Sequence, residues 1–398
     1  MKTINHIHFL AIALGALLAG CGGGEVSAPA TVTPLGTQAA VTNASVKESV
    51  SACVGHASDC TAATIAGSPQ IAYVPAEGGF VDGTAMQARF YGPTGLAVDQ
   101  MGNAYVADTL NHAIRKITPA GVVTTLAGNG AKGFSNGTGK DASFNEPKGV
   151  AVDTDGNVYV ADTSNHVIRK ITPAGVVTTF AGGAKIDSIF DRKRDGVGTD
   201  AAFSVPTGVA VDAAGTVYVA DSGNNVIRKI TATGVVTTLA GGAVRDPFAK
   251  DAVNFVDGTG AEASFRNPTA IAVDSSGNAY VADLMDNAIR KISPAGVVST
   301  LAGSIVSGHD DKVGTSARFQ MPTGVAVDRS GNVYVTEIFS GGIRVISPAG
   351  EVRTLAGDAG GNFNLITNLN PAAVAVGSNG TLFFSEALTH RIRTIAHK

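Results

Sequence analysis

Six carboxylates recur at one position of a repeated segment, and they are the side chains of this chain best placed to do chemistry. Each closes a short apolar run, as Asp108 does after Ala104 to Ala107. The six are Asp108, Asp162, Asp221, Asp283, Glu337 and Glu386. Hard cations bind several oxygens at once, so an acidic ring at this position could hold a cation. The alternative is that each carboxylate caps the turn that follows it or pairs with the Arg that recurs in every copy.

Three histidines stand at a fixed distance after these carboxylates, as His112, His166 and His390. A histidine that recurs at one turn position favours a turn-forming role or a contact between repeats over a ligand role. Glu146 and Lys148 are unmatched charges, because most other copies have Thr where Lys148 stands. An adjacent carboxylate and amine are not enough to indicate acid–base catalysis.

Known catalytic motifs are missing from the chain in any plausible context, including HExxH, GxSxG and the P-loop. The runs expected to line a central channel, such as Gly95 to Asp99, contain no His, and their Asp recurs at the far end. We therefore expect no catalytic residue and no cofactor. A bound Ca²⁺ or Zn²⁺ ion is the alternative.

The elements that position these side chains come from six copies of one pattern. The copies begin at Pro93, Pro147, Pro206, Pro268, Pro322 and Pro371. Within each copy, short runs rich in Val, Ile, Tyr and Thr alternate with turns that contain Gly-Asn or Pro-Ala-Gly, which is typical of antiparallel strands. The pattern predicts an all-β fold, a six-bladed β-propeller with four antiparallel strands in each blade.

Strand order then predicts two unlike faces. The first strand of each blade lines the channel, and the second turn of every blade lies with the inter-blade linkers on one face, the long-loop face. The first and third turns lie on the opposite, tight-turn face. Because binding residues concentrate on long loops, we expect the binding site on the long-loop face. A Phe that precedes each opening Pro by three residues, such as Phe144, is expected to anchor the linker in the core.

The sixth copy lacks its fourth strand, and a matching fragment lies near the N-terminus. Thr64 to Gly67 resembles Thr125 to Gly128 of the first copy. We therefore predict that an N-terminal strand completes the last blade and covers an otherwise open strand edge.

The N-terminal region predicts export. Residues 1–20 contain Lys2 and an apolar run from Phe9 to Ala19 that is too short to remain as a membrane span. The run ends in Leu18-Ala19-Gly20-Cys21, which resembles a bacterial lipoprotein signal. That resemblance implies lipidation of Cys21 and membrane anchoring, and the lack of Asp after Cys21 implies the outer membrane of the cell envelope.

Three regions follow from this: the signal peptide (1–20), a flexible tether (21–51) and the propeller (52–398). In an exported chain Cys53 and Cys60 are expected to form a disulfide, although His56 between them leaves a metal site as the alternative. The net charge of −3 gives no basic stripe, so no nucleic-acid partner is expected. We expect a monomer.

The Asn111-His112 and Asn165-His166 pairs, with the linker from Phe144 to Asp153, resemble the NHL-repeat family of six-bladed propellers. The family includes amidating lyases, protein- and RNA-binding modules and bacterial envelope proteins, so the resemblance implies the fold and leaves the function open. We expect a binding or scaffold module for a protein, peptide or glycan, with the least repetitive loops (183–195 and 243–255) as a specificity surface. A metal-dependent lyase or hydrolase with its site at the channel mouth is the alternative.

Overall fold

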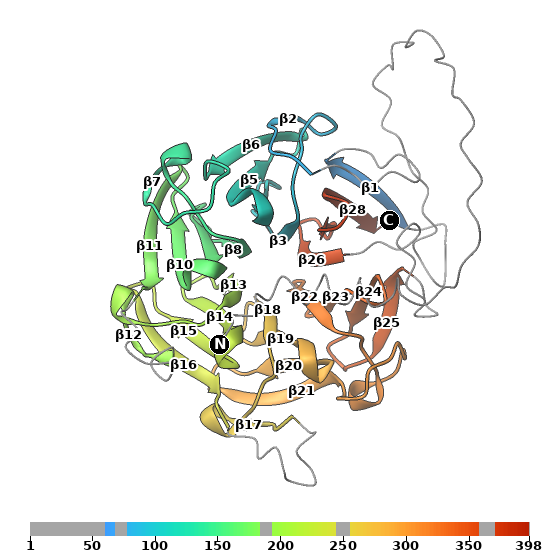
Figure 1. Cartoon of the computed structure of the whole chain (residues 1–398). Helices are drawn as coiled ribbons and strands as arrows, with labels where there is room; N and C mark the ends of the chain where they lie inside the picture. The colour runs from blue at the N-terminus through green and yellow to red at the C-terminus, as the bar shows by residue number, and fades with distance from the viewer. Residues whose placement is uncertain (1–59, 68–77, 184–192, 244–254, 358–370, 398) are drawn as a thin grey trace, which may run out of the picture. The chain divides into compact units, whose positions relative to one another are not determined.

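The computed structural model describes residues 60–67, 78–183, 193–243, 255–357 and 371–397 (Figure 1). All of them belong to one of the two compact units into which the chain divides, Lys47–Lys398. No helix in these ranges is long and apolar enough to cross a membrane.

Six antiparallel sheets are arranged in a ring, which confirms the predicted propeller. Blade 1 runs outward through β3 (Pro93–Val98), β4 (Ala104–Asp108), β5 (Ala113–Ile117) and β6 (Val122–Ala127). The next blades are β8 (Pro147–Val152), β9 (Val158–Asp162), β10 (Val167–Ile171) and β11 (Val176–Gly182); β13 (Pro206–Val211), β14 (Val217–Asp221), β15 (Val226–Ile230) and β16 (Val235–Gly241); β18 (Pro268–Val273), β19 (Ala279–Asp283), β20 (Ala288–Ile292) and β21 (Val297–Gly303); and β22 (Pro322–Val327), β23 (Val333–Glu337), β24 (Gly342–Ile346) and β25 (Val352–Ala356). The inner strands of successive blades contact one another around the whole ring.

Blade 6 is built from both ends of the chain, as predicted. It contains β26 (Pro371–Val376), β27 (Leu382–Glu386) and β28 (Arg391–His397), and β1 (Cys60–Ala66) pairs antiparallel with β28. The side chain of Ala66 is fully buried in the core between blade 6 and blade 1. Strand β1 therefore covers the edge of β28 and also contributes Ala66 to the hydrophobic core between blades 6 and 1.

Blades 1 to 4 have a fifth strand that the repeat pattern did not predict. Each incoming linker contributes a two-residue outer strand, namely β2 (Gly83–Thr84), β7 (Gly137–Thr138), β12 (Gly196–Val197) and β17 (Gly258–Thr259). Two residues are too few to show a periodic pattern, which is why this strand escaped prediction. The linker phenylalanines are buried as expected, and Phe144 is 0% exposed between blades 1 and 2.

Candidate functional site

The six repeated carboxylates lie beneath the long-loop face, inside the blades. Their exposed fractions are between 0% and 1%. Asp108 shows the arrangement: its Oδ2 accepts hydrogen bonds from Arg115 Nη1 at 2.8 Å and Asn111 Nδ2 at 2.9 Å. Its Oδ1 accepts the backbone N–H of Tyr91 at 2.7 Å. With both oxygens bonded and no exposed surface, this carboxylate offers no oxygen to a ligand in the channel.

Burial raises the pKa of the four aspartates in this set. It raises the pKa of Asp108 to about 6, against the lowering effect of hydrogen bonds from Asn111 and Tyr91 and of the Arg115 charge. Burial likewise raises the pKa of Asp221 to about 6. For Asp283, burial and the nearby Asp286 carboxylate raise the pKa to about 7.

Each repeated Arg pairs with the carboxylate of its own blade, which is one of the roles that the sequence predicted for these carboxylates. Arg115 donates from Nη1 to Asp108 and from Nη2 to Asp82 of the incoming linker, both at 2.8 Å. The Phe80 and Phe90 rings lie 5.0 Å from its guanidinium carbon. The Arg therefore ties the linker to the blade that follows it.

The histidines connect neighbouring blades at the long-loop face. His112 Nδ1 accepts the backbone N–H of Glu146 in the next linker at 3.0 Å. His166 accepts from Val205 at 2.9 Å, and His390 accepts from Gly92 across the junction of blades 6 and 1 at 3.1 Å. Burial lowers the pKa values of His112 and His390, which favours the neutral ring that can accept these hydrogen bonds.

The backbone conformation at the histidine position explains why Asn or Gly replaces His in the other copies. This position has a left-handed backbone in every blade, with φ of 50° at His112, 54° at Asn225 and 63° at Gly341. Asn225 Oδ1 accepts the next linker's N–H at 2.7 Å, as the histidines do. Since Asn and Gly tolerate positive φ better than other residues, the His, Asn and Gly alternation in the sequence is a signal of backbone geometry.

Glu146 and Lys148 lie at the junction of blades 1 and 2 together with His112. Glu146 also has positive φ, 50°, and its Oε2 accepts the Ser164 hydroxyl at 3.1 Å. Lys148 is half-buried on the inner strand β8, and burial lowers its pKa while the Glu146 charge raises it. The structure thus brings three predicted site residues together at one point of the long-loop face.

Other predicted features fall outside the described residues. These are the lipidation site Cys21, the disulfide partner Cys53, and most of the two loops expected to carry specificity (184–192 and 244–254). Cys60 begins β1 and its backbone pairs with His397. Within the described ranges, no group of three or more His, Cys, Asp or Glu could hold a metal ion.

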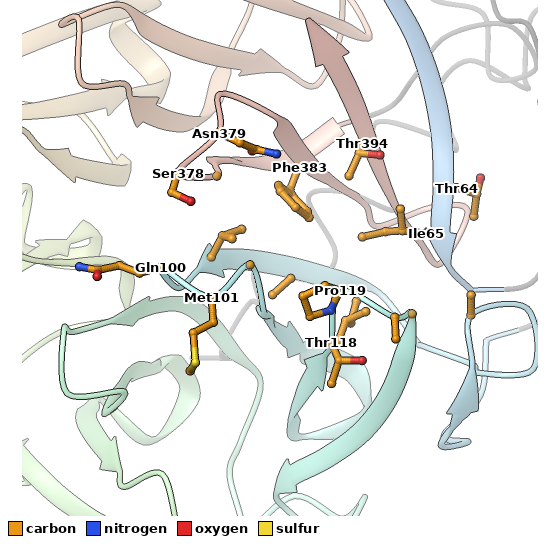
Figure 2. A pocket seen from close by; sticks show the side chains of 18 residues that line it. Thr64, Ile65, Gln100, Met101, Thr118, Pro119, Ser378, Asn379, Phe383 and Thr394 are labelled. Carbon is orange, nitrogen blue, oxygen red and sulfur yellow. The ribbon is translucent and has the colours of Figure 1, made fainter.

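Two surface features were missed by the sequence reasoning. The tips of the turns that follow the second strands are apolar and exposed in four blades, at Leu110, Met285, Phe339 and Leu388. A pocket also opens on the tight-turn face, where blade 6 meets blade 1 (Figure 2). Both occur where the copies differ from one another, and that difference was the available signal.

The fold and repeat geometry define the class of this protein, an NHL-repeat β-propeller. Residues 90–117, 144–171 and 203–230 match the profile of the NHL repeat. These segments fall in blades 1, 2 and 3, and each contains the buried Asp–Arg pair.

Two curated proteins illustrate the relationship. SUPPRESSOR OF QUENCHING 1 of Arabidopsis thaliana is 32% identical over 284 residues, which cover 68% of this chain and 26% of that protein. NHL repeat-containing protein 2 of Bos taurus is 28% identical over 338 residues, which cover 76% of this chain and 46% of that protein. The chain therefore spans less than half the length of either relative.

Solved structures show the same fold at low identity. A protein of unknown function from Bacteroides thetaiotaomicron has a TM-score of 0.61 and 20% identity, covering 85% of this chain and 76% of its own. An auxiliary nutrient binding protein from Bacteroides ovatus has a TM-score of 0.60 and 14% identity, covering 85% and 77%. A gluconolactonase from Xanthomonas campestris has a TM-score of 0.56 and 11% identity, covering 88% and 96%. At these identities the likeness shows the fold alone.

Proposed function

We propose that this propeller is a binding module that captures a polypeptide partner through its long-loop face. The observation that carries the proposal is an arc of exposed apolar side chains, which we call the apolar arc. It consists of Met285, Phe339, Leu388 and Leu110, at the same turn position of blades 4, 5, 6 and 1, which follow one another around the ring. These side chains are 37% to 40% exposed.

The apolar arc is a departure from the repeat. Blades 2 and 3 have Ser164 and Gly223 at the same position, so blade geometry does not require an apolar residue there. Tyr91, 44% exposed, extends the arc in blade 1. Its ring contacts His390 of blade 6 edge-on, with centroids 5.2 Å apart. An exposed apolar surface that the fold does not need is typical of an interaction site.

The part of the long-loop face outside the apolar arc carries polar groups. Blades 2 and 3 have Ser164 and Gly223 at the arc position, and the Ser164 hydroxyl donates to Glu146 Oε2 at 3.1 Å. Glu146 and Lys148 lie at the junction of blades 1 and 2, and blade 1 also carries Leu110, so the face offers apolar contacts beside charged groups. This combination suits a polypeptide whose apolar side chains adjoin a charged group.

Two of the similar structures suggest different functions. One is described as an auxiliary nutrient binding protein and the other as a gluconolactonase. The binding reading is favoured because the repeated carboxylates of this chain are committed to arginine within the blades. Metal analysis tests the alternative of a metal-dependent lyase or hydrolase: a stoichiometric, tightly held transition metal would overturn the non-catalytic proposal.

Selection from a random peptide library displayed on phage tests the proposal directly. The test variant replaces three arc residues by the serine found in blade 2 (Met285→Ser, Phe339→Ser, Leu388→Ser). The control replaces three exposed valines of the outer strands (Val122→Thr, Val176→Thr, Val235→Thr). We expect selected peptides to bind the arc variant at least tenfold more weakly in calorimetric titration and to bind the control like the parent. Failure to enrich any peptide, or equal binding to the arc variant, would contradict the proposal.

We also propose that the propeller is anchored to the outer membrane through a lipid on Cys21, with residues 21–51 as the tether. Support comes from the sequence Leu18-Ala19-Gly20-Cys21 and the Gly-rich and Ser/Thr-rich composition that follows. Expression in a bacterial host with radiolabelled palmitate should label the parent chain and leave a Cys21→Ser variant unlabelled. A parent chain that stays unlabelled and fractionates with soluble proteins would refute the anchor and leave the binding proposal intact.

A further inference from the structure

The junction of blade 6 and blade 1 contains a pocket on the tight-turn face, which we call the seam pocket. Its volume is about 520 Å³, within the range of roughly 300–1,000 Å³ typical of small-molecule sites. Figure 2 shows Phe383, Ser378 and Asn379 of blade 6 on one side and Thr118 and Pro119 of blade 1 on the other. Strand β1, which closes the ring, forms a third wall. The seam pocket therefore lies on the face opposite the apolar arc.

Blades 1 to 4 fill this position with a repeated trio of side chains. In blade 1 the Tyr105 hydroxyl donates to Asp99 Oδ2 at 3.2 Å, and Lys116 Nζ lies 5.5 Å from the Tyr105 ring centroid. The same trios are Asp153, Tyr159 and Lys170; Asp212, Tyr218 and Lys229; and Asp274, Tyr280 and Lys291. Each trio occupies the tight-turn end of its blade with a carboxylate, a phenol and an ammonium group.

Blade 6 replaces all three members. Gly377 stands where the Asp belongs, Phe383 where the Tyr belongs and Thr394 where the Lys belongs, and all three line the seam pocket. Phe383 pairs with Thr394 across β27 and β28, as Tyr105 pairs with Lys116 across β4 and β5. Compared with the trios of blades 1 to 4, blade 6 therefore lacks the Asp carboxymethyl group, the Tyr hydroxyl and the long Lys side chain. These losses leave more space and remove both charges of the trio.

The walls of the seam pocket have a distinct chemistry. Among the described residues that line it, none is charged. The Phe383 ring supplies an apolar platform, and Asn379 and Gln100 supply amides while Ser378 and Thr118 supply hydroxyls. Amides and hydroxyls both donate and accept hydrogen bonds, so they match ligand hydroxyl groups in either role. Two of these groups already accept one hydrogen bond each, since Asn379 Oδ1 accepts the Thr381 N–H at 3.1 Å and Thr118 Oγ1 accepts the Val122 N–H at 3.2 Å. A fully apolar ligand would exclude water from the remaining donors without replacing its hydrogen bonds, and an anionic ligand would find no cation.

We propose that the seam pocket binds a neutral saccharide. A pyranose has an apolar face of C–H groups that can lie on the Phe383 ring and a rim of hydroxyls that amide and hydroxyl side chains can bond. In the seam pocket, the Phe383 ring meets the first requirement, and the amide and hydroxyl side chains of blades 6 and 1 meet the second. This site is independent of polypeptide binding at the apolar arc, because the two lie on opposite faces of the ring.

A variant that rebuilds the repeat gives the sharpest test. Gly377→Asp, Phe383→Tyr and Thr394→Lys together restore the trio that blades 1 to 4 already contain. A Cβ on Gly377 would approach Asn379 Oδ1 at 3.0 Å and Phe383 Cε2 at 3.1 Å. Both are side-chain atoms that can move, so we expect the rebuilt chain to fold. Asn379→Ala, an exposed substitution, is the second variant and keeps the test valid if the rebuilt chain does not fold.

The full chain is screened on an array of neutral and anionic glycans, and cellotriose, maltotriose, mannotriose and triacetylchitotriose are then titrated in solution. We expect a neutral glycan to bind the parent and to bind the rebuilt variant and Asn379→Ala at least tenfold more weakly, with peptide binding at the arc unchanged. The proposal is overturned if no neutral glycan binds, if binding survives the rebuilt trio, or if anionic glycans or the amphiphilic anion anilinonaphthalene sulfonate bind more tightly than neutral glycans.

Discussion

Arg115 and Asp108 form an ion pair in which both side chains are fully buried, with Nη1 and Oδ2 2.8 Å apart. The pair recurs in every blade, and its longest version joins Arg393 to Glu386 at 3.3 Å in blade 6. In blade 1 the second guanidinium nitrogen, Nη2, reaches Asp82 in the linker, also at 2.8 Å. In blades 1 to 5, the buried Arg therefore ties the incoming linker to the blade that follows it.

Breaking one such pair should be costly. Arg228→Met leaves the buried Asp221 carboxylate without its cation, and we expect the free energy of unfolding to fall by about 3–5 kcal/mol. Lys229→Met, on the same strand and half-exposed, should change it by less than about 1 kcal/mol. Guanidinium denaturation at pH 8 measures both. Equal stability of the two variants would show that the buried pair contributes nothing beyond its packing.

The fall in the free energy of unfolding caused by Arg228→Met, which we call the Arg228→Met deficit, should also depend on pH. Burial already raises the pKa of Asp221 to about 6 from its ordinary 3.8, so the folded state holds a proton that the unfolded state has lost between these values. A folded-state pKa above the unfolded one means that this group contributes more stability as pH falls. Without Arg228 the pKa rises further, so we expect the deficit to be smaller at pH 5 than at pH 8. A deficit that grows on acidification would contradict this.

His112 provides an opposite pH dependence. Its Nδ1 must be unprotonated to accept the Glu146 N–H at 3.0 Å, and burial lowers its pKa below the ordinary 6.5, with Lys132 also lowering it and Glu146 opposing. Because the folded pKa lies below the unfolded one, stability from this group is present above pH 6.5 and is lost as pH falls through and below that value. His112→Asn keeps the acceptor and the left-handed backbone, as Asn225 does.

We therefore expect His112→Asn and the parent to unfold alike at pH 8, and the variant to be the more stable of the two at pH 5.5. Thermal unfolding of both chains across this range measures the difference. A parallel pH dependence for the two proteins would exclude a role for His112 titration.

The latch strand β1 should control the stability of the whole ring. Its pairing with β28 runs from Cys60 to Ala66, and its loss would expose the β28 edge and remove Ala62 and Ala66 from the core. A chain beginning at Ser68 should melt well below one beginning at Ser51, as measured by scanning calorimetry. Equal melting temperatures would mean that blade 6 is stable with three strands.

Inner-strand glycines permit the closest approach between blades. A Cβ on Gly95 would lie 1.9 Å from the backbone oxygen of Lys148, an atom that cannot move without its strand. We expect Gly95→Ala to lower the free energy of unfolding by about 1–3 kcal/mol. The control is Ala270→Gly, because Ala270 occupies the same strand position in blade 4. That change should cost about 0.5–1 kcal/mol, and a smaller effect of Gly95→Ala would show that the blades can separate at the channel.

Much of the fold could be predicted because each repeat carries its own local signals. Turn residues, strand-forming runs and the Thr64 to Gly67 fragment predicted the blades and the closing strand, and the pairing of β1 with β28 confirms the latter. The two-residue strands such as β2 could not be predicted, because only their contact with an outer strand makes them strands. The pairing of the repeated carboxylates with the repeated Arg could also be predicted, and the structure confirms it. The second bond of each Arg, such as that from Arg115 to Asp82 of the linker, could not be predicted, because it depends on which side chains face the same interior.

The number of blades, their order and the closing of the ring could be predicted from the amino-acid sequence, because the turn residues and strand-forming runs repeat about every sixty residues. The places where the surface departs from the repeat became visible only in the folded ring. The apolar arc exists because the tips of Met285, Phe339, Leu388 and Leu110 come from successive blades of a closed ring. The seam pocket exists because small residues of blade 6, such as Gly377 and Thr394, meet blade 1 at Thr118 and Pro119. An empty volume depends on which segments pack together, and here those segments come from opposite ends of the chain.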